Sequence, residues 1–547
     1  MTNPLDDPFY YLANFASVVD WIGRRYSDLL TPDELGFIAG FGALPQPSRA
    51  LLVRMVMRKG DLFRASKLNY PEIGPTPEAA APLLALGWID GGGTLSLEQL
   101  FGLLTKPELV QAFGLTGQQA AAKKAEQLAA LAEAHVEPRR FPDWYPASTD
   151  ALYRLRITPL CDRLRVMYFG NGYQDWTEFV LSDLGVFRYE KVELEASTCA
   201  FRTRAEVDHY LQLHDCRSRF HDGDAVDAVV GAIPVEPFDN PWLESRRARL
   251  LFQIGQHYEQ AGELEAALNV YASSRYPGAR SRTIRVLERC ERYAEAFDLA
   301  GAAQAAPASE AEQQHLLRVV PRLRRKLGLP KLVRAAPASV SEMELGLARP
   351  ITDFHVEGVV RDHFHLEHAP VHYVENALIN SLFGLLCWEA IFLALPGAFF
   401  HPFQSGPADL LSADFHHRRR DAFATQLDAL ESDRYKGIIL QNFEAKHGLQ
   451  SPFVYWGGVS GELLQQALAC MPPAHLRKFF ERILRDLGAN RTGFPDLIQF
   501  WPGEGRYRMI EVKGPGDRLQ DNQRRWLDYC AAHGMPVTVC YVHWTPA

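Results

Sequence analysis

The stretch RTGFPDLIQFWPGEGRYRMIEVKGPGDRLQDNQRRWLDYCAAHGMPVTVCYVHW, residues 491–544, decides how the C-terminal part of the chain folds. Its runs DLIQFW and YRMIEVK have the composition of short β-strands, and the turn PGEG between them predicts a hairpin. A helix from about Asp517 to His533 and a third strand, PVTVCYVHW, should follow. The predicted order is therefore strand, strand, helix, strand.

Three side chains of this stretch carry chemistry. Asp496 opens the first strand, and Glu511 and Lys513 lie two residues apart on the second, so both point from the same face. Hard cations such as Mg²⁺ and Mn²⁺ take oxygen ligands, which two carboxylates and the carbonyl of Val512 would supply. Such a cation would polarise a scissile phosphate and acidify a water molecule, and Lys513 would orient that water and offset the charge of the transition state.

The triplet Glu-Val-Lys alone is more often a solvated strand face, but here a proline precedes Asp496 and a GPGDRL turn and a glutamine follow. The combination resembles the PD-(D/E)XK nuclease core, and the form GFPDL…IEVKGPGDRLQDNQRRWL closely resembles the VRR-nuclease domain. The resemblance implies an α/β catalytic domain with a central mixed sheet over residues 346–547. It places Asp496, Glu511 and Lys513 on the catalytic motif and Gln523 on the glutamine after it.

The same resemblance implies an acidic metal ligand from an upstream helix. The segment VHYVENALINSLFGLLCWEAIF, residues 371–392, matches that helix and puts Glu375 in the ligand position. Glu389 is the alternative, although it lies deeper in an apolar run. Arg491, just before the motif, is a candidate for holding a phosphate.

The first 140 residues are predicted to form small helical units, since apolar residues recur every three or four positions. Residues 103–131, LLTKPELVQAFGLTGQQAAAKKAEQLAAL, resemble a SAP motif, a DNA-binding helical hairpin. Thr105 and Glu108 should form a capping box, and Lys123 and Lys124 should lie on the second helix. The alternative is an ordinary hairpin with a solvated lysine pair. Residues 141–236 are expected to form a globular DNA-binding region.

Residues 237–335 are predicted to form paired helices. Six positions match a tetratricopeptide repeat, in which small residues let two helices approach and aromatic residues fill the gap: Leu251, Gly255, Tyr258, Ala267, Tyr271 and Ser274. Four arginines share one helix face there, at Arg282, Arg285, Arg289 and Arg292. The face either binds phosphate or is merely solvated and balanced by nearby glutamates. We expect Arg280, Arg282 and Arg285 to hold the DNA backbone or a 5′ phosphate.

The bulk composition narrows the class of protein. At 547 residues, three or four domains are expected. A net charge of -8 means that any DNA-binding surface must be segregated from the rest. The eight cysteines are scattered, which argues against structural zinc and a disulfide framework. Neither a signal peptide nor a long apolar run appears, so we expect a cytoplasmic protein without a membrane partner.

The order of helical region, SAP-like hairpin, helical repeats and VRR-nuclease domain is similar to the Fanconi-associated nuclease family in its shorter bacterial form. The resemblance implies a mostly α, multidomain, structure-selective endonuclease that needs Mg²⁺ or Mn²⁺. Its substrates would be 5′-flap, branched and cross-linked DNA, with 5′-to-3′ exonuclease activity, in interstrand cross-link repair. Eukaryotic members carry a ubiquitin-binding zinc finger, for which this sequence has no cysteine set.

Two other functions stay open. A nuclease of another role, such as a restriction enzyme or a junction resolvase, would share the same core, but such enzymes cut two strands as dimers. A monomer that nicks one strand would favour the flap nuclease. The second alternative is a repeat scaffold with a catalytically silent nuclease domain, against which the intact set of acidic residues argues.

Overall fold

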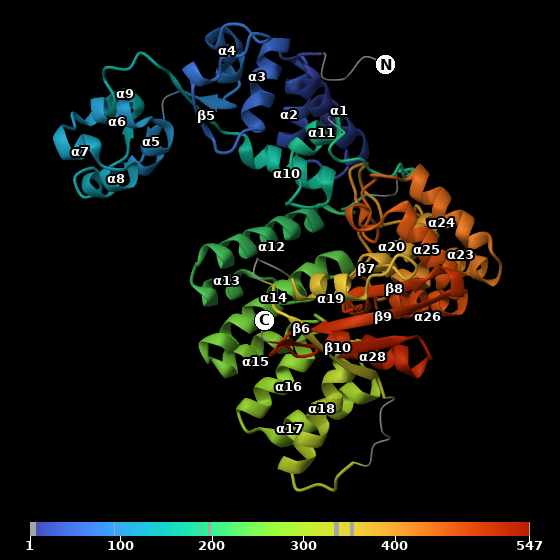
Figure 1. The fold of residues 1–547 in the computed structure, drawn as a ribbon. Coiled ribbons are helices and arrows are strands. Elements are labelled where there is room, and N and C mark those ends of the chain that lie inside the picture. Colours follow the sequence, from blue (N-terminus) through green and yellow to red (C-terminus); the bar gives the residue numbers. More distant parts are fainter. Residues whose placement is uncertain are drawn as a thin grey trace. The chain divides into compact units, whose positions relative to one another are not determined.

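The computed structural model describes residues 7–91, 93–183, 185–194, 199–332, 339–350 and 355–545 (Figure 1). Contacts between Cα atoms divide the chain into two compact units. The first comprises residues 1–187 and 199–207, and the second comprises residues 188–198 and 208–547. Among the described residues, no helix is both long and apolar enough to cross a lipid bilayer.

The first unit consists of short helices around a small antiparallel sheet of order β1-β5-β2. Strand β5 belongs to the region expected at 141–236, but it pairs with two strands of the expected N-terminal region. The contacts therefore group the chain differently from the four predicted regions. The elements are α1 (Tyr10–Arg25), α2 (Pro32–Ala43), α3 (Gln46–Val56), β1 (Leu62–Arg64), η2 (Ala65–Lys67), α4 (Thr76–Ala85), β2 (Ile89–Asp90), β3 (Thr94–Leu95), α5 (Leu97–Leu103), α6 (Lys106–Phe113), α7 (Gly117–Ala121), α8 (Lys124–Ala132), β4 (Arg139–Arg140), α9 (Phe141–Trp144), β5 (Leu152–Leu155), α10 (Thr158–Phe169) and α11 (Thr177–Asp183).

The SAP-like segment has three helices, α6, α7 and α8, because the short α7 interrupts the expected two-helix hairpin. The predicted capping box at the start of α6 is confirmed, and the Glu108 carboxylate accepts a hydrogen bond of 2.7 Å from the Thr105 backbone N–H. Leu100 and Leu109 lie in a small core of this region. The sequence therefore predicted the start of α6 from its capping residues, but it did not predict the additional helix α7.

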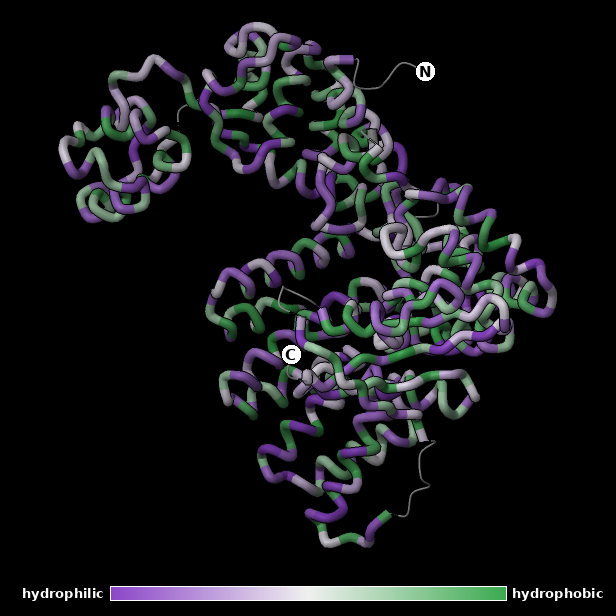
Figure 2. The backbone as a smooth tube through the Cα atoms, in the orientation of Figure 1, coloured by the Kyte–Doolittle hydropathy of each residue, from purple (hydrophilic) through white to green (hydrophobic). Residues whose placement is uncertain are grey.

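The second unit begins with a run of helices in which each of α14 to α18 packs against the next. These helices are α12 (Arg204–Asp222, shared with the first unit), α13 (Val226–Ala232), α14 (Pro241–Ala261), α15 (Leu264–Ala272), α16 (Ala279–Arg289), α17 (Tyr293–Ala305) and α18 (Glu310–Lys326). In Figure 2 hydrophilic and hydrophobic residues alternate along them, as expected for amphipathic helices. Gly255 lies directly against the Tyr271 ring, where a Cβ atom would be 2.5 Å from a ring carbon.

A five-stranded sheet of order β6-β10-β9-β8-β7 forms the centre of the C-terminal part. Strands β7, β8 and β9 are antiparallel, whereas β10 runs parallel to both β9 and β6, so the predicted mixed sheet is confirmed. The strands are β6 (Ser341–Ala348), β7 (Val371–Tyr373), β8 (Leu497–Trp501), β9 (Arg506–Lys513) and β10 (Val537–Thr545). Helix α28 (Asp521–Ala532) starts four residues later than predicted, because Gln520 and Gln523 form its capping box.

Helices cover both faces of this sheet. Ile498, Phe500 and Met509 belong to the larger core, and Leu497, Ile510 and Val512 to the smaller one, as the alternation of a strand requires. The remaining elements of this part of the chain are α19 (Val356–Phe364), α20 (Leu378–Leu386), α21 (Trp388–Ile391), α22 (Phe415–Arg418), α23 (Arg420–Asp428), η3 (Ala429–Glu431), α24 (Arg434–Ala445), η4 (Trp456–Gly458), α25 (Gly461–Cys470), α26 (Pro473–Arg485) and α27 (Leu487–Asn490). The short η5 (Pro502–Glu504) closes the predicted hairpin.

Candidate active site

The pairing of β8 with β9 brings the two buried carboxylates together. Leu497 lies opposite Ile510, so Asp496, one residue earlier, lies opposite Glu511 on the same face. The backbone N–H of Val512 donates a hydrogen bond of 2.8 Å to Asp496 Oδ2. Lys513, two residues after Glu511, places its Nζ atom 2.8 Å from Glu511 Oε1. The chemistry-bearing residues of the IEVK motif therefore share one face with Asp496.

These groups are buried to a degree that is unusual for charges. The exposed fraction is 0% for Glu511, 7% for Asp496 and 8% for Lys513. The Lys513 ammonium, at 2.8 Å from Oε1, is the one compensating contact of the Glu511 carboxylate among the described residues. Burial raises the pKa of Glu511, and the adjacent Asp496 raises it further. Burial likewise raises the pKa of Asp496.

Glu375 lies near this pair but on a different kind of element than expected. It occupies the turn between β7 and α20, because Asn376 adopts a left-handed conformation with φ of 53° and the helix begins only at Leu378. The Glu375 carboxylate accepts hydrogen bonds from the Tyr373 hydroxyl and, at 3.1 Å, from Asn376 Nδ2. Its charge raises the pKa of both Asp496 and Glu511. The placement on a helix was wrong, but the turn does bring Glu375 beside the pair.

The Glu375 turn is fastened to the loop before Asp496. Asn376 Oδ1 accepts hydrogen bonds of 2.9 Å from the Gly493 N–H and 3.3 Å from the Phe494 N–H. The rival residue, Glu389 on α21, is mostly exposed and its one ion-pair contact among the described residues is with Lys446, at 4.0 Å. The structure therefore favours Glu375 over Glu389.

Sequence reasoning missed Glu357, in the first turn of α19. Its charge raises the pKa of Asp496 and that of Tyr373, so it faces the same cluster from a fourth element. Val356, the residue before it, packs beside Gly514 at the end of β9. A glutamate in a helix that precedes the β7 edge strand was the available signal, but neither β7 nor its register with β8 could be recognised from the sequence.

The donor set fits a hard divalent cation, although its oxygens do not yet meet at one point. No three histidine, cysteine or acidic side chains within the described ranges are arranged to hold a metal ion. The like charges of the three carboxylates repel one another, and hydrogen bonds hold the Glu375 carboxylate at Tyr373 and Asn376. The expected convergence of Glu375, Asp496 and Glu511 is thus incomplete. However, the single ammonium of Lys513 faces two buried carboxylates, and a divalent cation would compensate the remaining negative charge.

Gln523 and Arg491 have other contacts than the ones expected. Gln523 Oε1 accepts a hydrogen bond of 2.8 Å from the Gln520 N–H and so caps α28. Arg491 donates to the Pro452 carbonyl and lies over the Phe453 ring, 4.7 Å from its centroid. Both residues are close in sequence to the motif, but these contacts leave their catalytic and phosphate-binding roles as predictions.

The predicted DNA-binding residues differ in how far other residues of the chain already contact their positive charge. Arg280 pairs with buried Glu312 at 2.8 Å and also donates to a backbone carbonyl. Lys124 Nζ donates to the Leu104 carbonyl at 2.7 Å, whereas Lys123 is exposed. Arg280 and Lys124 therefore have structural contacts in addition to any contact with DNA.

Three arginines of α16 share a single carboxylate. Glu259, with an exposed fraction of 4%, pairs with Arg282, Arg285 and Arg289 at 3.3, 3.1 and 3.5 Å. Arg285 and Arg289 remain the most exposed of the three. One negative charge cannot balance three positive ones, so this cluster carries a local excess of positive charge.

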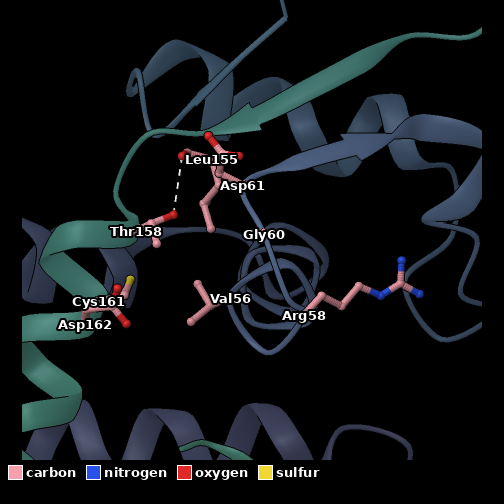
Figure 3. A pocket seen from close by; sticks show the side chains of 8 residues that line it. All are labelled: Val56, Arg58, Gly60, Asp61, Leu155, Thr158, Cys161 and Asp162. Carbon is pink, nitrogen blue, oxygen red and sulfur yellow. Dashed lines mark hydrogen bonds between the residues drawn. The ribbon is translucent and has the colours of Figure 1, made fainter. Parts of the chain in front are cut away.

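A separate cavity of about 380 Å³ lies in the first unit and is lined by Val56, Arg58, Gly60, Asp61, Leu155, Thr158, Cys161 and Asp162 (Figure 3). Arg58 points away from its centre in this view. The Cys161 thiol is buried, which raises its pKa and makes it a poor nucleophile. The cavity contains none of the predicted site residues.

Family models match three segments of the chain. They are "FAN1, HTH domain" at residues 9–90, "Fanconi anemia-associated nuclease SAP domain" at 94–144, and "VRR-NUC domain" at 430–544. The SAP prediction is thereby confirmed. Asp496, Glu511 and Lys513 lie inside the VRR-NUC match, and Glu375 lies before it. A VRR-NUC nuclease domain implies a requirement for a divalent metal ion.

Whole-chain relatives agree with these matches. A protein of Pseudomonas aeruginosa described as "Fanconi-associated nuclease 1 homolog" is 56% identical over 540 residues, covering 99% of this chain and 97% of its own. A rice protein of the same description is 24% identical and covers 97% of this chain and 62% of its own.

Two solved structures have the same fold. A crystal structure of paFAN1 bound to 2nt 5′-flap DNA with a gap has a TM-score of 0.95 at 56% identity, and covers 99% of both chains. A second paFAN1 structure, with 1nt 5′-flap DNA, has a TM-score of 0.93 at the same identity. This chain belongs to the Fanconi-associated nuclease 1 family and is a DNA nuclease.

Proposed function

We propose that this nuclease cleaves 5′-flap and branched DNA as a structure-selective endonuclease, has 5′-to-3′ exonuclease activity, and takes part in interstrand cross-link repair. One observation carries the catalytic part: Asp496, Glu511 and Lys513 are buried together within the segment that matches a nuclease domain. The 5′ flap is the DNA bound in the structures of the 56% identical relative. DNA as substrate also makes the cytoplasm of a bacterium the proposed site of action.

We assign the cation as Mg²⁺ or Mn²⁺, held by Glu375, Asp496, Glu511 and the Val512 carbonyl. When bound, it would withdraw charge from the scissile phosphate and make a water molecule more acidic. The Val512 N–H fixes the Asp496 carboxylate, and the Glu511 carboxylate fixes the Lys513 ammonium. Lys513 is therefore positioned to orient the attacking water and to stabilise the negative charge that develops on the phosphate.

The helical region before the sheet would hold the DNA backbone. Its packing, with Gly255 against Tyr271, agrees with a tetratricopeptide-like arrangement. Arg282, Arg285 and Arg289 face one carboxylate, so their excess charge is available to phosphates, and phosphate contacts suit an enzyme that recognises shape rather than sequence. Arg280 is a weaker candidate because Glu312 already neutralises it. Lys123 would contribute from the SAP segment.

A cleavage assay tests the proposal on 5′-flap, 3′-flap, splayed and linear duplex DNA with Mg²⁺, Mn²⁺ or chelator. We expect 5′-flap cutting that stops with chelator and falls by about 10²- to 10³-fold in Asp496→Ala, since losing a group that helps to stabilise developing charge costs this much. Glu504→Gln is the matched control, because this exposed carboxylate of the same hairpin pairs only with Arg506 among the described residues. Cutting that survives chelation or Asp496→Ala would contradict the mechanism, and paired cuts in both strands would favour a resolvase.

A further inference from the structure

A second cavity, of about 480 Å³, lies beside the candidate active site. Asn376 and Asn380 line it from α20 and the turn before it, Tyr455 from the SPFVYWGG segment, and Arg491 and Thr492 from the loop before Asp496. Asn376 Nδ2 donates a hydrogen bond to the Glu375 carboxylate, so the cavity is adjacent to the acidic cluster. A cavity of this size accommodates a small ligand such as one nucleotide.

Arg491 brings a positive charge to this cavity without a negative partner. It forms no ion pair with any carboxylate in the described part of the chain, and its Nε atom is buried without an acceptor. Its contacts are the Pro452 carbonyl and the Phe453 ring, which orient the guanidinium but do not neutralise it. A half-buried, uncompensated guanidinium is suited to a phosphate, which it can bind through two parallel hydrogen bonds.

Tyr455 brings an exposed aromatic ring to the same cavity. Its exposed fraction is 65%, which is high for a tyrosine that lines a cavity. The ring rests against Gly458, where a Cβ atom would lie 2.5 Å from a ring carbon and 3.0 Å from Ala377 Cβ. The Tyr455 N–H is anchored by a hydrogen bond of 3.2 Å to Ser381 Oγ. The two glycines of the WGG sequence thus support one side of the ring and leave another side open.

We propose that this cavity binds one nucleotide of the strand that is cut, adjacent to the scissile phosphate, with its base stacked on Tyr455 and its phosphate on Arg491. Aromatic rings bind bases of any sequence because every base has a π face, which suits a nuclease selected by DNA structure. This inference rests on the proposed nuclease function, since it places the nucleotide relative to the cut.

Substrates with a single abasic residue test the stacking. The parent protein, Tyr455→Phe and Tyr455→Ala are compared on a series of 5′-flap DNAs in which the abasic residue moves along the cut strand. We expect kcat/KM to fall about tenfold for Tyr455→Ala, and by a similar factor for the parent when the abasic residue is at one position next to the cut. At that position the two losses should not multiply, and Tyr455→Phe should behave as the parent does.

The controls separate this proposal from the nuclease function itself. Tyr173→Ala, which removes another exposed tyrosine that does not line this cavity, should leave the position dependence unchanged. For the parent, a neutral methylphosphonate in place of one phosphate near the cut should lower kcat/KM, and Arg491→Gln should remove this difference. Because Arg491 is half-buried, the Arg491→Gln variant can fail to fold. In that case Tyr455→Ala remains the decisive variant. Losses that multiply at every abasic position, or no sensitive position, would overturn the proposal. Failure of the parent to cut intact 5′-flap DNA would instead contradict the nuclease function.

Discussion

Glu511 is the residue at which burial by the fold is least favourable for a charged side chain. Its carboxylate is fully buried, it lies opposite Asp496, and the Lys513 ammonium is the one group among the described residues that compensates its charge. Because burial and Asp496 raise its pKa, the native metal-free protein binds protons that the unfolded chain has already released. The sequence could predict that Glu511 and Lys513 share a face, since strands alternate with a period of two. It could not predict the turn geometry at Glu375, which depends on Asn376 contacting a distant loop.

The stability of the metal-free protein should depend on pH through these two carboxylates. The ordinary pKa of Glu511 is 4.5 and that of Asp496 is 3.8, and both are raised in the native state. Metal-free stability should therefore be greatest below about pH 4.5 for these two groups and should fall as the pH rises through their raised pKa values. We expect Mn²⁺ to restore stability at high pH and Glu511→Gln to flatten the metal-free profile. Thermal unfolding in chelator and in Mn²⁺, from about pH 5 to about pH 9, measures both.

Glu504→Gln is again the control, because this exposed carboxylate should leave the pH profile unchanged. A Glu511→Gln profile as steep as that of the parent would show that burial of this carboxylate is not the cause. Equal Mn²⁺ stabilisation of Glu511→Gln and the parent would contradict its assignment as a metal ligand.

At the scale of elements, the packing of α14 on α15 depends on one missing side chain. Gly255→Ala would place a methyl group 2.5 Å from the Tyr271 ring, and the ring is buried and cannot move freely. Overpacking of this kind costs about 1–3 kcal/mol. We expect Gly255→Ala to lower the Tm of metal-free protein and to increase hydrogen exchange in α14 and α15.

Gly301→Ala is the matched control, since Gly301 lies within α17 and a Cβ atom added there would have no neighbour within 4 Å outside its own helix backbone. There alanine should stabilise the helix by up to about 1 kcal/mol. If both substitutions had the same sign, close packing at Gly255 would not be the cause. The repeat-like spacing predicted Gly255 and Tyr271 as partners, because small and aromatic residues at these positions reflect local packing. The edge strands β6 and β7 escaped prediction, because their pairing partners are far away in the sequence.

For the molecule as a whole, a net charge of -8 opposes the binding of a polyanion such as DNA. Binding is still possible if the positive side chains gather on one surface, apart from the negative ones. In the second unit, ion pairs neutralise some arginines of α16 and α18, for example Arg322 with Glu288 and Arg318 with Asp521. The three arginines that share Glu259 carry more positive charge than this one carboxylate balances. The sequence indicated the arginine-bearing face from its helical spacing, but not which arginines a carboxylate neutralises, since Glu259 lies on another helix, α14.

The salt dependence of DNA binding should locate this excess charge. Each phosphate contact that is lost lowers the slope of log Kd against log salt by about 0.9. We therefore expect Arg285→Gln with Arg289→Gln to weaken binding of 5′-flap DNA at low salt, to reduce that slope by up to about 1.8, and to leave the preference for 5′ over 3′ flaps unchanged. Arg292→Gln is the control, because Arg292 already faces both Glu265 and Glu295. Fluorescence anisotropy at several salt concentrations, with Asp496→Ala as the non-cutting background, gives the slopes. An unchanged slope in the double variant would mean that the DNA backbone does not lie on the Glu259 cluster.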